Sequence, residues 1–299
     1  MTAWALVAVG AALPALRRRL SLKPAVVLAG AATAPVAASV VVRRERLRDV
    51  TVCALQMWAY IAAYELPHDD PERLARRVRI DYPIAVDRVL GLGELPTVRM
   101  QRRFSAPGRV NRAEQVLSMC HWIWFAVPHL TLAYIWVRAP GRFPSAAARM
   151  YTLFDIGACF YWLVPTAPPW WAAERGRPLA VRRTMIEFGP SFWGRLWKPL
   201  YQFLGGNPLA AMPSMHLATS LMGAELLTEV GPLAGAVGWM YAGALGVALI
   251  YLGEHYLIDL LAGAALSEAV QALHPRFAPA YRGVARALAR LRRFALEDR

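Results

Sequence analysis

Long apolar runs separate the charged segments of this chain, and their length limits the folds that it can adopt. A helix needs about 17 to 25 apolar residues to cross a bilayer, and eight runs approach or reach that length. They lie at about residues 2–16, 25–42, 50–66, 115–137, 149–165, 212–230, 232–252 and 256–273. The pattern therefore predicts an all-α, polytopic helical bundle that is integral to a membrane.

The composition supports this class of protein. Of the 299 residues, 57% are hydrophobic and 18% are charged, whereas a soluble domain has about 25% charged residues. The net charge of +14 comes from arginine, because Lys23 and Lys198 are the only lysines among the 34 basic residues. Arginines that flank apolar runs are typical of cytoplasmic loops and lipid headgroup contacts. The sequence excludes a soluble enzyme and a disordered chain, and it predicts no nucleic-acid partner.

The three cysteines predict neither a disulfide scaffold nor a zinc site. Cys53, Cys120 and Cys159 all fall inside apolar runs. A thiol in such a run behaves as a small hydrophobic side chain, and the spacings match no metal-binding pattern.

Two long segments connect the apolar runs. In residues 66–114, Leu74 and Val78 lie one helical turn apart among several arginines, which predicts an interfacial helix there. Residues 166–208 contain many prolines, glycines and tryptophans, which are typical of turns at headgroup level. We expect this segment to touch a substrate, through Pro169, Trp170 and Trp171.

The chain has three parts by this pattern. Residues 1–49 form N-terminal membrane helices, residues 50–273 form a membrane core, and residues 274–299 form a basic amphipathic tail. In the tail, Arg282, Arg286, Arg290 and Arg293 share one helical face. We expect this tail to lie on anionic lipid at the cytoplasmic surface.

The spacing of the runs places two polar clusters at the same membrane face. Residues 232–252 cross the bilayer once, because 21 residues span about 31 Å. Ser214 and His216 precede this crossing and His255 and Asp259 follow it, so all four lie at one face. The hairpin of 115–137 and 149–165 places both long segments at that face as well.

The orientation follows from the short loops. Residues 43–49 and 138–149 and the tail are rich in arginine, which predicts that they are cytoplasmic and that the face with the histidines is extracytoplasmic. The basic loop 17–23 disagrees if residues 2–16 truly cross the membrane. That first run lacks the basic start of a secretory signal, so we expect a short membrane helix there rather than a cleaved peptide.

Ionisable residues inside membrane runs are costly and are functional candidates. The candidates in this chain are Asp155, His216, Glu225, His255, Asp259 and Glu268. His255 and Asp259 are four residues apart, so the carboxylate can orient the imidazole and strengthen it as a nucleophile. Glu225 and Glu268 each lie nine residues further along their helices, about 13 Å toward the opposite face. Asp155 is expected to be a hydrogen-bond partner inside the bundle.

His216 lies at the predicted start of a helix, after Pro213-Ser214-Met215. Ser214 is a suitable N-cap, and the free amides of a helix start bind anions. A single buried histidine is commonly a packing residue, but two histidines and an aspartate at one face favour a catalytic site. We expect no metal, because three ligands without an H-E-x-x-H pattern make a poor site. A transporter or proton relay is an alternative, although its ionisable groups should lie at several depths.

These residues resemble the type 2 phosphatidic acid phosphatase superfamily of membrane lipid phosphatases and phosphotransferases. Pro213-Ser214-Met215-His216 matches its P-S-x-H motif, and the segment from His255 to Asp259 matches its H-x-x-x-D motif. The resemblance covers roughly residues 50–273 and implies a six-helix core, here with about two extra N-terminal helices. It also implies that His255 attacks phosphorus, that Asp259 orients it, and that His216 protonates the leaving group, without metal or cofactor.

Two family cations are missing. Trp170 stands where the first motif has lysine, ahead of Arg177-Pro178, and Leu249 stands where the third motif has arginine. This pattern looks more like the inositol phosphorylceramide synthase branch. We expect Ser214, Arg182 and Arg183 to bind the phosphate instead, since the guanidinium fork fits phosphate oxygens. Arg99, Arg102 and Arg103 are alternative cations.

The resemblance implies an enzyme that moves a phosphorylated headgroup, with inositol phosphate as one candidate, from a phospholipid donor to a lipid or glycolipid acceptor. The intermediate would be a phosphohistidine. A lipid or polyprenyl phosphate phosphatase of the same superfamily is the alternative within this chemistry.

Overall fold

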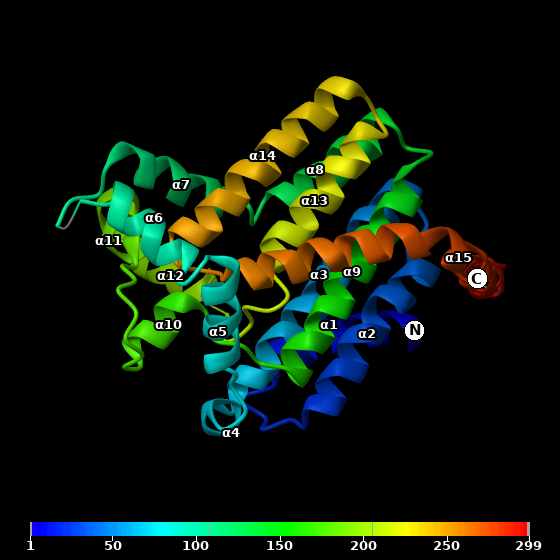
Figure 1. The fold of residues 1–299 in the computed structure, drawn as a ribbon. Coiled ribbons are helices and arrows are strands. Elements are labelled where there is room, and N and C mark those ends of the chain that lie inside the picture. Colours follow the sequence, from blue (N-terminus) through cyan, green and yellow to red (C-terminus); the bar gives the residue numbers. More distant parts are fainter. Residues whose placement is uncertain (1, 107, 205, 298–299) are drawn as a thin grey trace. The chain divides into compact units, whose positions relative to one another are not determined.

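The computed structural model describes residues 2–106, 108–204 and 206–297 (Figure 1). In these residues the chain is helical between turns, and the only β-type pairing consists of isolated bridges. The predicted all-α class is therefore confirmed. A helix occupies each of the eight apolar runs.

The chain divides into two compact units, one made of the residues up to Asp70 and from Ala272 onward, the other of Pro71–Gln271. The first unit contains α1 (Thr2–Leu16), α2 (Pro24–Val41), α3 (Glu45–Glu65) and the 3-10 helix η1 (Leu66–Asp69). Gly10 and Gly30 bring α1 and α2 close together, since a Cβ on Gly10 would lie 2.4 Å from the Gly30 carbonyl oxygen. Arg17 is buried and pairs with Glu65 and Asp69.

The second unit contains the remaining helices. They are α4 (Pro71–Ala75), α5 (Asp81–Leu90), α6 (Pro96–Phe104), α7 (Arg112–Ile123), α8 (Val127–Arg138), α9 (Phe143–Leu163), α10 (Pro169–Glu174), α11 (Thr184–Trp193), η2 (Gly194–Leu196), α12 (Trp197–Leu204), α13 (Met215–Thr228), α14 (Pro232–Tyr251) and the first part of α15 (Leu257–Glu297). α15 continues from this unit into the first as one helix that contains Pro275 and Pro279.

Helices α13 and α14 form an antiparallel pair in the second unit (Figure 1). Gly238 lies against Ala224 so closely that a Cβ there would be 2.7 Å from the Ala224 Cα. α8 and α9 pack on α13, and α6 and α7 pack on α14. Leu245, Leu249 and Leu260 join α14 to α15 in a buried apolar cluster.

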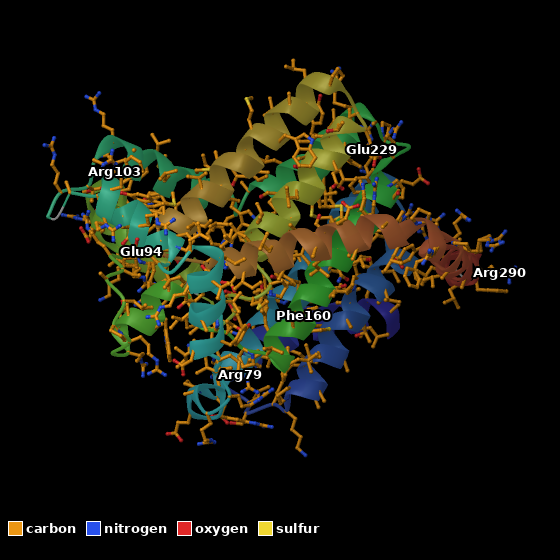
Figure 2. All side chains as sticks on the ribbon, in the orientation of Figure 1. Arg79, Glu94, Arg103, Phe160, Glu229 and Arg290 are labelled. Carbon is orange, nitrogen blue, oxygen red and sulfur yellow. The ribbon has the colours of Figure 1, made fainter. Side chains whose placement is uncertain are left out.

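Among the residues that the structure describes, three helices are long and apolar enough to cross a membrane by length and composition, and the bent pair α7 and α8 would make a fourth. The three are Pro24–Val41, Pro232–Tyr251 and the part of α15 from Leu257 to Phe294. Large apolar side chains point outward from this second unit, among them Leu130, Met240 and Phe160, which is labelled on α9 in Figure 2. Such exposed apolar side chains suit contact with lipid.

The predicted run 115–137 is broken by a bend of 57° between α7 and α8. Pro128 has no N–H to donate to the Trp124 carbonyl, and the amides of residues 124–127 instead bond three residues back. The structure also corrects the two long segments. The helix expected around Leu74 and Val78 ends at Ala75, and residues 166–208 contain three short α-helices rather than turns alone.

Three backbone segments of the second unit meet at Thr166, which forms bridges with Arg79 and with Ala210. The Ala167 amide donates to the Arg79 carbonyl at 3.0 Å, and the Thr166 amide donates to the Leu209 carbonyl at 2.9 Å. Thr166 is fully buried. We call Arg79, Thr166 and Ala210 the Thr166 junction. The segments continue from it into α5, α10 and α13.

Candidate active site

His216 and His255 face each other across the starts of α13 and α15. His216 Nδ1 lies 3.1 Å from His255 Nε2, and the two ring centroids are 5.2 Å apart. The other nitrogen of His255, Nδ1, lies 3.5 Å from Asp259 Oδ2. His255 and Asp259 are buried. The three side chains therefore form a line, as the i, i+4 spacing and the single crossing by α14 predicted.

The start of α13 is fixed to α15 by backbone contacts. Ser214 is the N-cap, and its Oγ accepts the Leu217 amide at 3.4 Å. The Ser214 amide donates to the Asp259 carbonyl at 3.0 Å. Gly263 makes room for this contact, because a Cβ there would lie 2.5 Å from the Ser214 carbonyl oxygen. The predicted cap is confirmed, and Ser214 joins the start of α13 to α15.

Asp87 of α5 caps the start of α15. Its Oδ2 accepts the Leu257 amide at 2.8 Å and its Oδ1 accepts the Ile258 amide at 2.9 Å. The side chain is fully buried. Burial raises the pKa of Asp87, and the charge of Asp259 adds to that rise, while the two amide bonds oppose it. The amides at the start of α15 are thus already bound by carboxylates, since the Tyr256 amide donates to Asp259 at 2.9 Å.

His121 and Trp124 form the wall behind His216. The His121 ring centroid lies 4.8 Å from that of His216, and the Trp124 ring centroid lies 4.1 Å from it. The bend between α7 and α8 lies next to these two residues. His121 is buried. The sequence motifs did not select His121. It is an ionisable residue inside an apolar run, which could have marked it as a candidate, but no recognisable motif surrounds it.

The α10 segment lies against the turn that leads to His255. The Trp170 amide donates to the Gly253 carbonyl at 3.1 Å, one residue before Glu254. The Arg183 guanidinium carbon lies 3.3 Å from the centroid of the Trp170 ring. Pro169 and Trp170 are buried and Trp171 is partly buried. Of the predicted substrate segment, Trp170 is thus next to the site.

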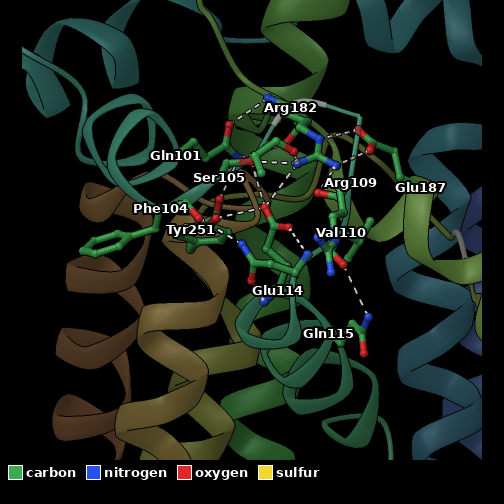
Figure 3. A network of polar contacts seen from close by, with 12 residues as sticks. Gln101, Phe104, Ser105, Arg109, Val110, Glu114, Gln115, Arg182, Glu187 and Tyr251 are labelled. Atoms are coloured by element: carbon green, nitrogen blue, oxygen red, sulfur yellow. Dashed lines mark hydrogen bonds and ion pairs between the residues drawn. The ribbon is translucent and has the colours of Figure 1, made fainter.

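Arg182 points into a separate polar network (Figure 3). Its guanidinium donates to Glu187 at 2.7 Å and to Ser105 at 2.7 Å, and it pairs with buried Glu114 at 3.3 Å. Gln101 accepts the Arg182 amide at 2.8 Å and donates to the Arg182 and Tyr251 carbonyls. Carboxylates and carbonyls thus occupy the Arg182 side chain, whereas Arg183 is the arginine beside the His255 turn.

The other ionisable candidates lie elsewhere in the second unit. Glu225 interacts electrostatically with Glu268 and Arg149. Asp155 is exposed on α9, so the expectation of a place inside the bundle was wrong. Of the alternative cations, Arg99 and Arg102 pair with Glu94, and Arg103 is exposed on α6 (Figure 2).

In the part of the chain that the structure describes, no group of three or more His, Cys, Asp or Glu side chains is arranged to hold a metal ion. Among the same residues, several buried polar atoms of the site have no hydrogen-bond partner. They include Nδ1 of His121, Nε of Arg183 and Oε1 of Glu254.

Sequence comparisons relate this chain to known proteins. The model of the PAP2 superfamily matches residues 86–273. The inositol phosphorylceramide synthase catalytic subunit of Schizosaccharomyces pombe is 25% identical over 170 residues, which are 51% of this chain and 39% of that protein. The inositol phosphorylceramide synthase of Candida albicans is 27% identical over 165 residues, 51% of this chain and 35% of that protein. No solved structure matches the chain significantly.

The matched region contains both histidine motifs, the Asp87 cap and the bent pair α7 and α8. It confirms the family suggested by those motifs and decides against the transporter alternative. The match covers well over half of this chain, although the aligned parts are little more than a third of the two synthases. On this evidence the chain belongs to the PAP2 superfamily and is an integral membrane enzyme of the phosphatase or phosphotransferase type.

Proposed function

We propose that this protein is a lipid phosphotransferase that moves a phosphorylated headgroup from a phospholipid to the hydroxyl group of a lipid or glycolipid acceptor. We name inositol phosphate as the candidate headgroup because the two related proteins are inositol phosphorylceramide synthases. The observation that carries the proposal is the line of His216, His255 and Asp259. Nδ1 of His255 faces a carboxylate at 3.5 Å, and Nε2 faces a second imidazole at 3.1 Å.

In the first step, His255 Nε2 attacks the phosphorus of the donor. The N–P bond forms while the P–O bond to the diacylglycerol part breaks, and His216 gives its proton to the leaving oxygen. Asp259 stabilises the positive charge that develops on the His255 ring. Because Nε2 now contacts His216, this contact must open to admit the phosphorus atom.

In the second step, the acceptor hydroxyl attacks phosphorus. His216 takes the hydroxyl proton, the new O–P bond forms, and the N–P bond to His255 breaks with its electron pair returning to the imidazole. Water in place of the acceptor would give hydrolysis by the same route. The reaction needs no metal, because the protein supplies the compensating positive charge.

Two groups are suited to hold the phosphoryl oxygens. The amides at the start of α13 are one, since His216 in the first turn of this helix lies 3.1 Å from His255 and a helix start favours anions. Arg183 is the other, because its guanidinium reaches the His255 turn over Trp170. The Arg182 side chain is bound by Glu114 and Glu187, so we assign it to positioning the Arg183 backbone.

We place this site at the extracytoplasmic face and the C-terminal tail in the cytoplasm. The arginine-rich loops 43–49 and 138–149 support this orientation. Arg17, in the loop that disagrees, is buried and paired with Glu65 and Asp69. That residue is therefore explained by packing.

The test uses the purified full chain in detergent with phosphatidylinositol, phosphatidic acid or a polyprenyl phosphate, each labelled with ³²P. We expect turnover that resists EDTA, and an acid-labile labelled protein after a short reaction. His255→Ala should abolish both. His129→Ala is the matched control, because His129 is an exposed histidine of α8 outside the site, and it should retain both.

The product separates the two candidate activities. When a lipid with a free hydroxyl group is added as acceptor, labelled acceptor lipid identifies a transferase, and free inorganic phosphate from a phosphomonoester identifies a phosphatase. Turnover that survives His255→Ala would contradict the mechanism for both.

A further inference from the structure

Trp170 lies beside two charged side chains next to the candidate nucleophile. Its ring face carries the Arg183 guanidinium carbon at 3.3 Å from the ring centroid. Its amide donates to the Gly253 carbonyl at 3.1 Å, which fixes α10 to the turn that carries Glu254, the residue before His255. A guanidinium and a carboxylate therefore lie on the two segments that this backbone contact joins.

Both charged side chains keep hydrogen-bonding capacity that the protein does not use. Glu254 Oε1 and Arg183 Nε are closed off from solvent and have no hydrogen-bond partner among the described residues. Arg183 pairs with Glu174 at 3.6 Å and donates to the Tyr201 hydroxyl at 2.8 Å, and no ion pair within 4.0 Å joins it to Glu254 in the described part of the chain. Unmet groups of this kind are costly unless a ligand or water completes them.

The two unmet atoms differ in what they require. Arg183 offers an N–H and needs an acceptor such as a phosphoryl oxygen. Glu254 offers an acceptor oxygen and needs a donor. Burial raises the pKa of Glu254, although the charges of Arg183 and His255 oppose the rise, so a donor would relieve a desolvated carboxyl group.

We propose that Trp170, Arg183 and Glu254 form a subsite for a phosphate group that carries a nearby free hydroxyl, with the phosphoryl oxygen at Arg183 and the hydroxyl at Glu254. Glu254 is then the residue that selects polyol headgroups. This inference rests on the proposed function for the place of the reacting phosphorus beside His255, and it adds a residue that selects the headgroup.

The surroundings favour a hydroxyl over an ammonium group as the donor. A quaternary ammonium binds over an aromatic face, but Arg183 already covers the Trp170 ring and Trp170 is otherwise buried. A primary ammonium beside Glu254 would also meet the positive charge of Arg183. A neutral hydroxyl donor avoids both problems.

The experiment measures binding of three soluble probes to the purified full chain in detergent, by ligand-observed NMR titration. Glycerol 3-phosphate carries hydroxyls, methyl phosphate carries none, and phosphoethanolamine carries an ammonium. We expect the wild-type protein to prefer glycerol 3-phosphate over methyl phosphate by about tenfold, the scale of one hydrogen bond to a charged group. We also expect it to bind phosphoethanolamine more weakly than glycerol 3-phosphate.

Glu254→Gln should reduce that preference to less than about threefold without weakening methyl phosphate binding. Arg183→Gln should weaken all three probes. Glu174→Gln is the matched control, because Glu174 is a second carboxylate beside Arg183 that is 56% exposed. It removes the same charge from the neighbourhood of Arg183 and should keep the preference. An unchanged gel-filtration profile shows that each variant is folded.

Four results would overturn the subsite. They are no preference in the wild type, an unchanged preference in Glu254→Gln, tighter binding of phosphoethanolamine than of glycerol 3-phosphate, and failure of every probe to bind at millimolar concentration. The phosphohistidine is scored separately by ³²P incorporation. A labelled enzyme without the preference removes the subsite alone, and the preference without a labelled enzyme removes the proposed function alone.

Discussion

Asp87 acts on the candidate nucleophile through the start of α15, where it accepts the Leu257 and Ile258 amides. We expect Asp87→Asn to lower kcat at least tenfold with little change in KM and to reduce stability by about 1 to 3 kcal/mol, because an amide can accept only one of the two amide hydrogens that Asp87 now accepts. Turnover and thermal unfolding in detergent measure this.

Asp81→Asn is the control for that variant, since Asp81 lies on the same helix and its side chain is 75% exposed in its ion pair with Arg177. Surface pairs of this kind contribute little. Equal losses of activity in the two variants would show that the α15 cap is not what matters.

Glu229 fixes the buried Arg149 at the other end of α13 (Figure 2). The Arg149 guanidinium donates to it at 2.6 and 2.9 Å, and this bonding holds the pKa of Glu229 below its usual value. Glu229→Gln should cost about 2 kcal/mol at pH 7 and lower the unfolding midpoint by about 5 °C.

The sign of the pH dependence follows from that lowered pKa. The stabilisation is complete above the pKa of an unfolded glutamate and is lost as the pH falls through the lower, folded value. The wild type and Glu229→Gln should therefore converge only when the pH falls below the lowered pKa of the folded Glu229. Glu45→Gln, which removes an acid that is 80% exposed, should match the wild type throughout. A gap that persists at low pH would contradict the ion-pair explanation.

For single residues, the sequence predicts those contacts whose two partners are close together in the chain. The i, i+4 spacing of His255 and Asp259 and the cap at Ser214 are local, and the structure contains both. Asp87 lies 170 residues from Leu257, and no local pattern links them. Arg182 and Arg183 are neighbours of one type, so only the three-dimensional contacts separate their environments.

Helix packing sets the distance between the two histidines. Gly263 lets α15 approach Ser214, and a Cβ there would meet the Ser214 carbonyl oxygen at 2.5 Å. Gly263→Ala should therefore separate α13 from α15 and reduce turnover at least tenfold. Gly243→Ala is the matched control, because it lies within α14 and nothing surrounds its position within 4 Å. Alanine there should stabilise the helix by up to about 1 kcal/mol, and equal turnover in both variants would contradict this account.

The apolar runs predict where helices form, because burial in lipid requires every backbone group to bond within its own helix. They do not predict the bend at Pro128, which places His121 and Trp124 beside His216. From the sequence alone, Pro128 is a proline inside a single apolar run, and the apolar pattern continues on both sides of it. Only the structure shows that a second helix starts next to this proline. The short helices α10, α11 and α12 were missed because glycine and proline mask their brief apolar patterns.

The orientation of the whole molecule can be measured by cysteine labelling. With Cys53, Cys120 and Cys159 replaced, we expect a cysteine at Ala180 to react with a membrane-impermeant maleimide in intact cells. A cysteine at Ala289 in the tail should react only after the cells are opened. Both positions are exposed in the structure. The reverse pattern would place the site in the cytoplasm and contradict the positive-inside argument.

The Thr166 junction has a consequence for how this enzyme family can diversify. The segment from Ala167 to Leu209 leaves the junction and returns to it, so its two ends stay together whatever lies between them. A surface segment closed in this way tolerates changes of length at small entropic cost. New substrate contacts around Glu254 can therefore arise by exchanging this one segment, while α5 and α13, which start from the same junction, keep their positions.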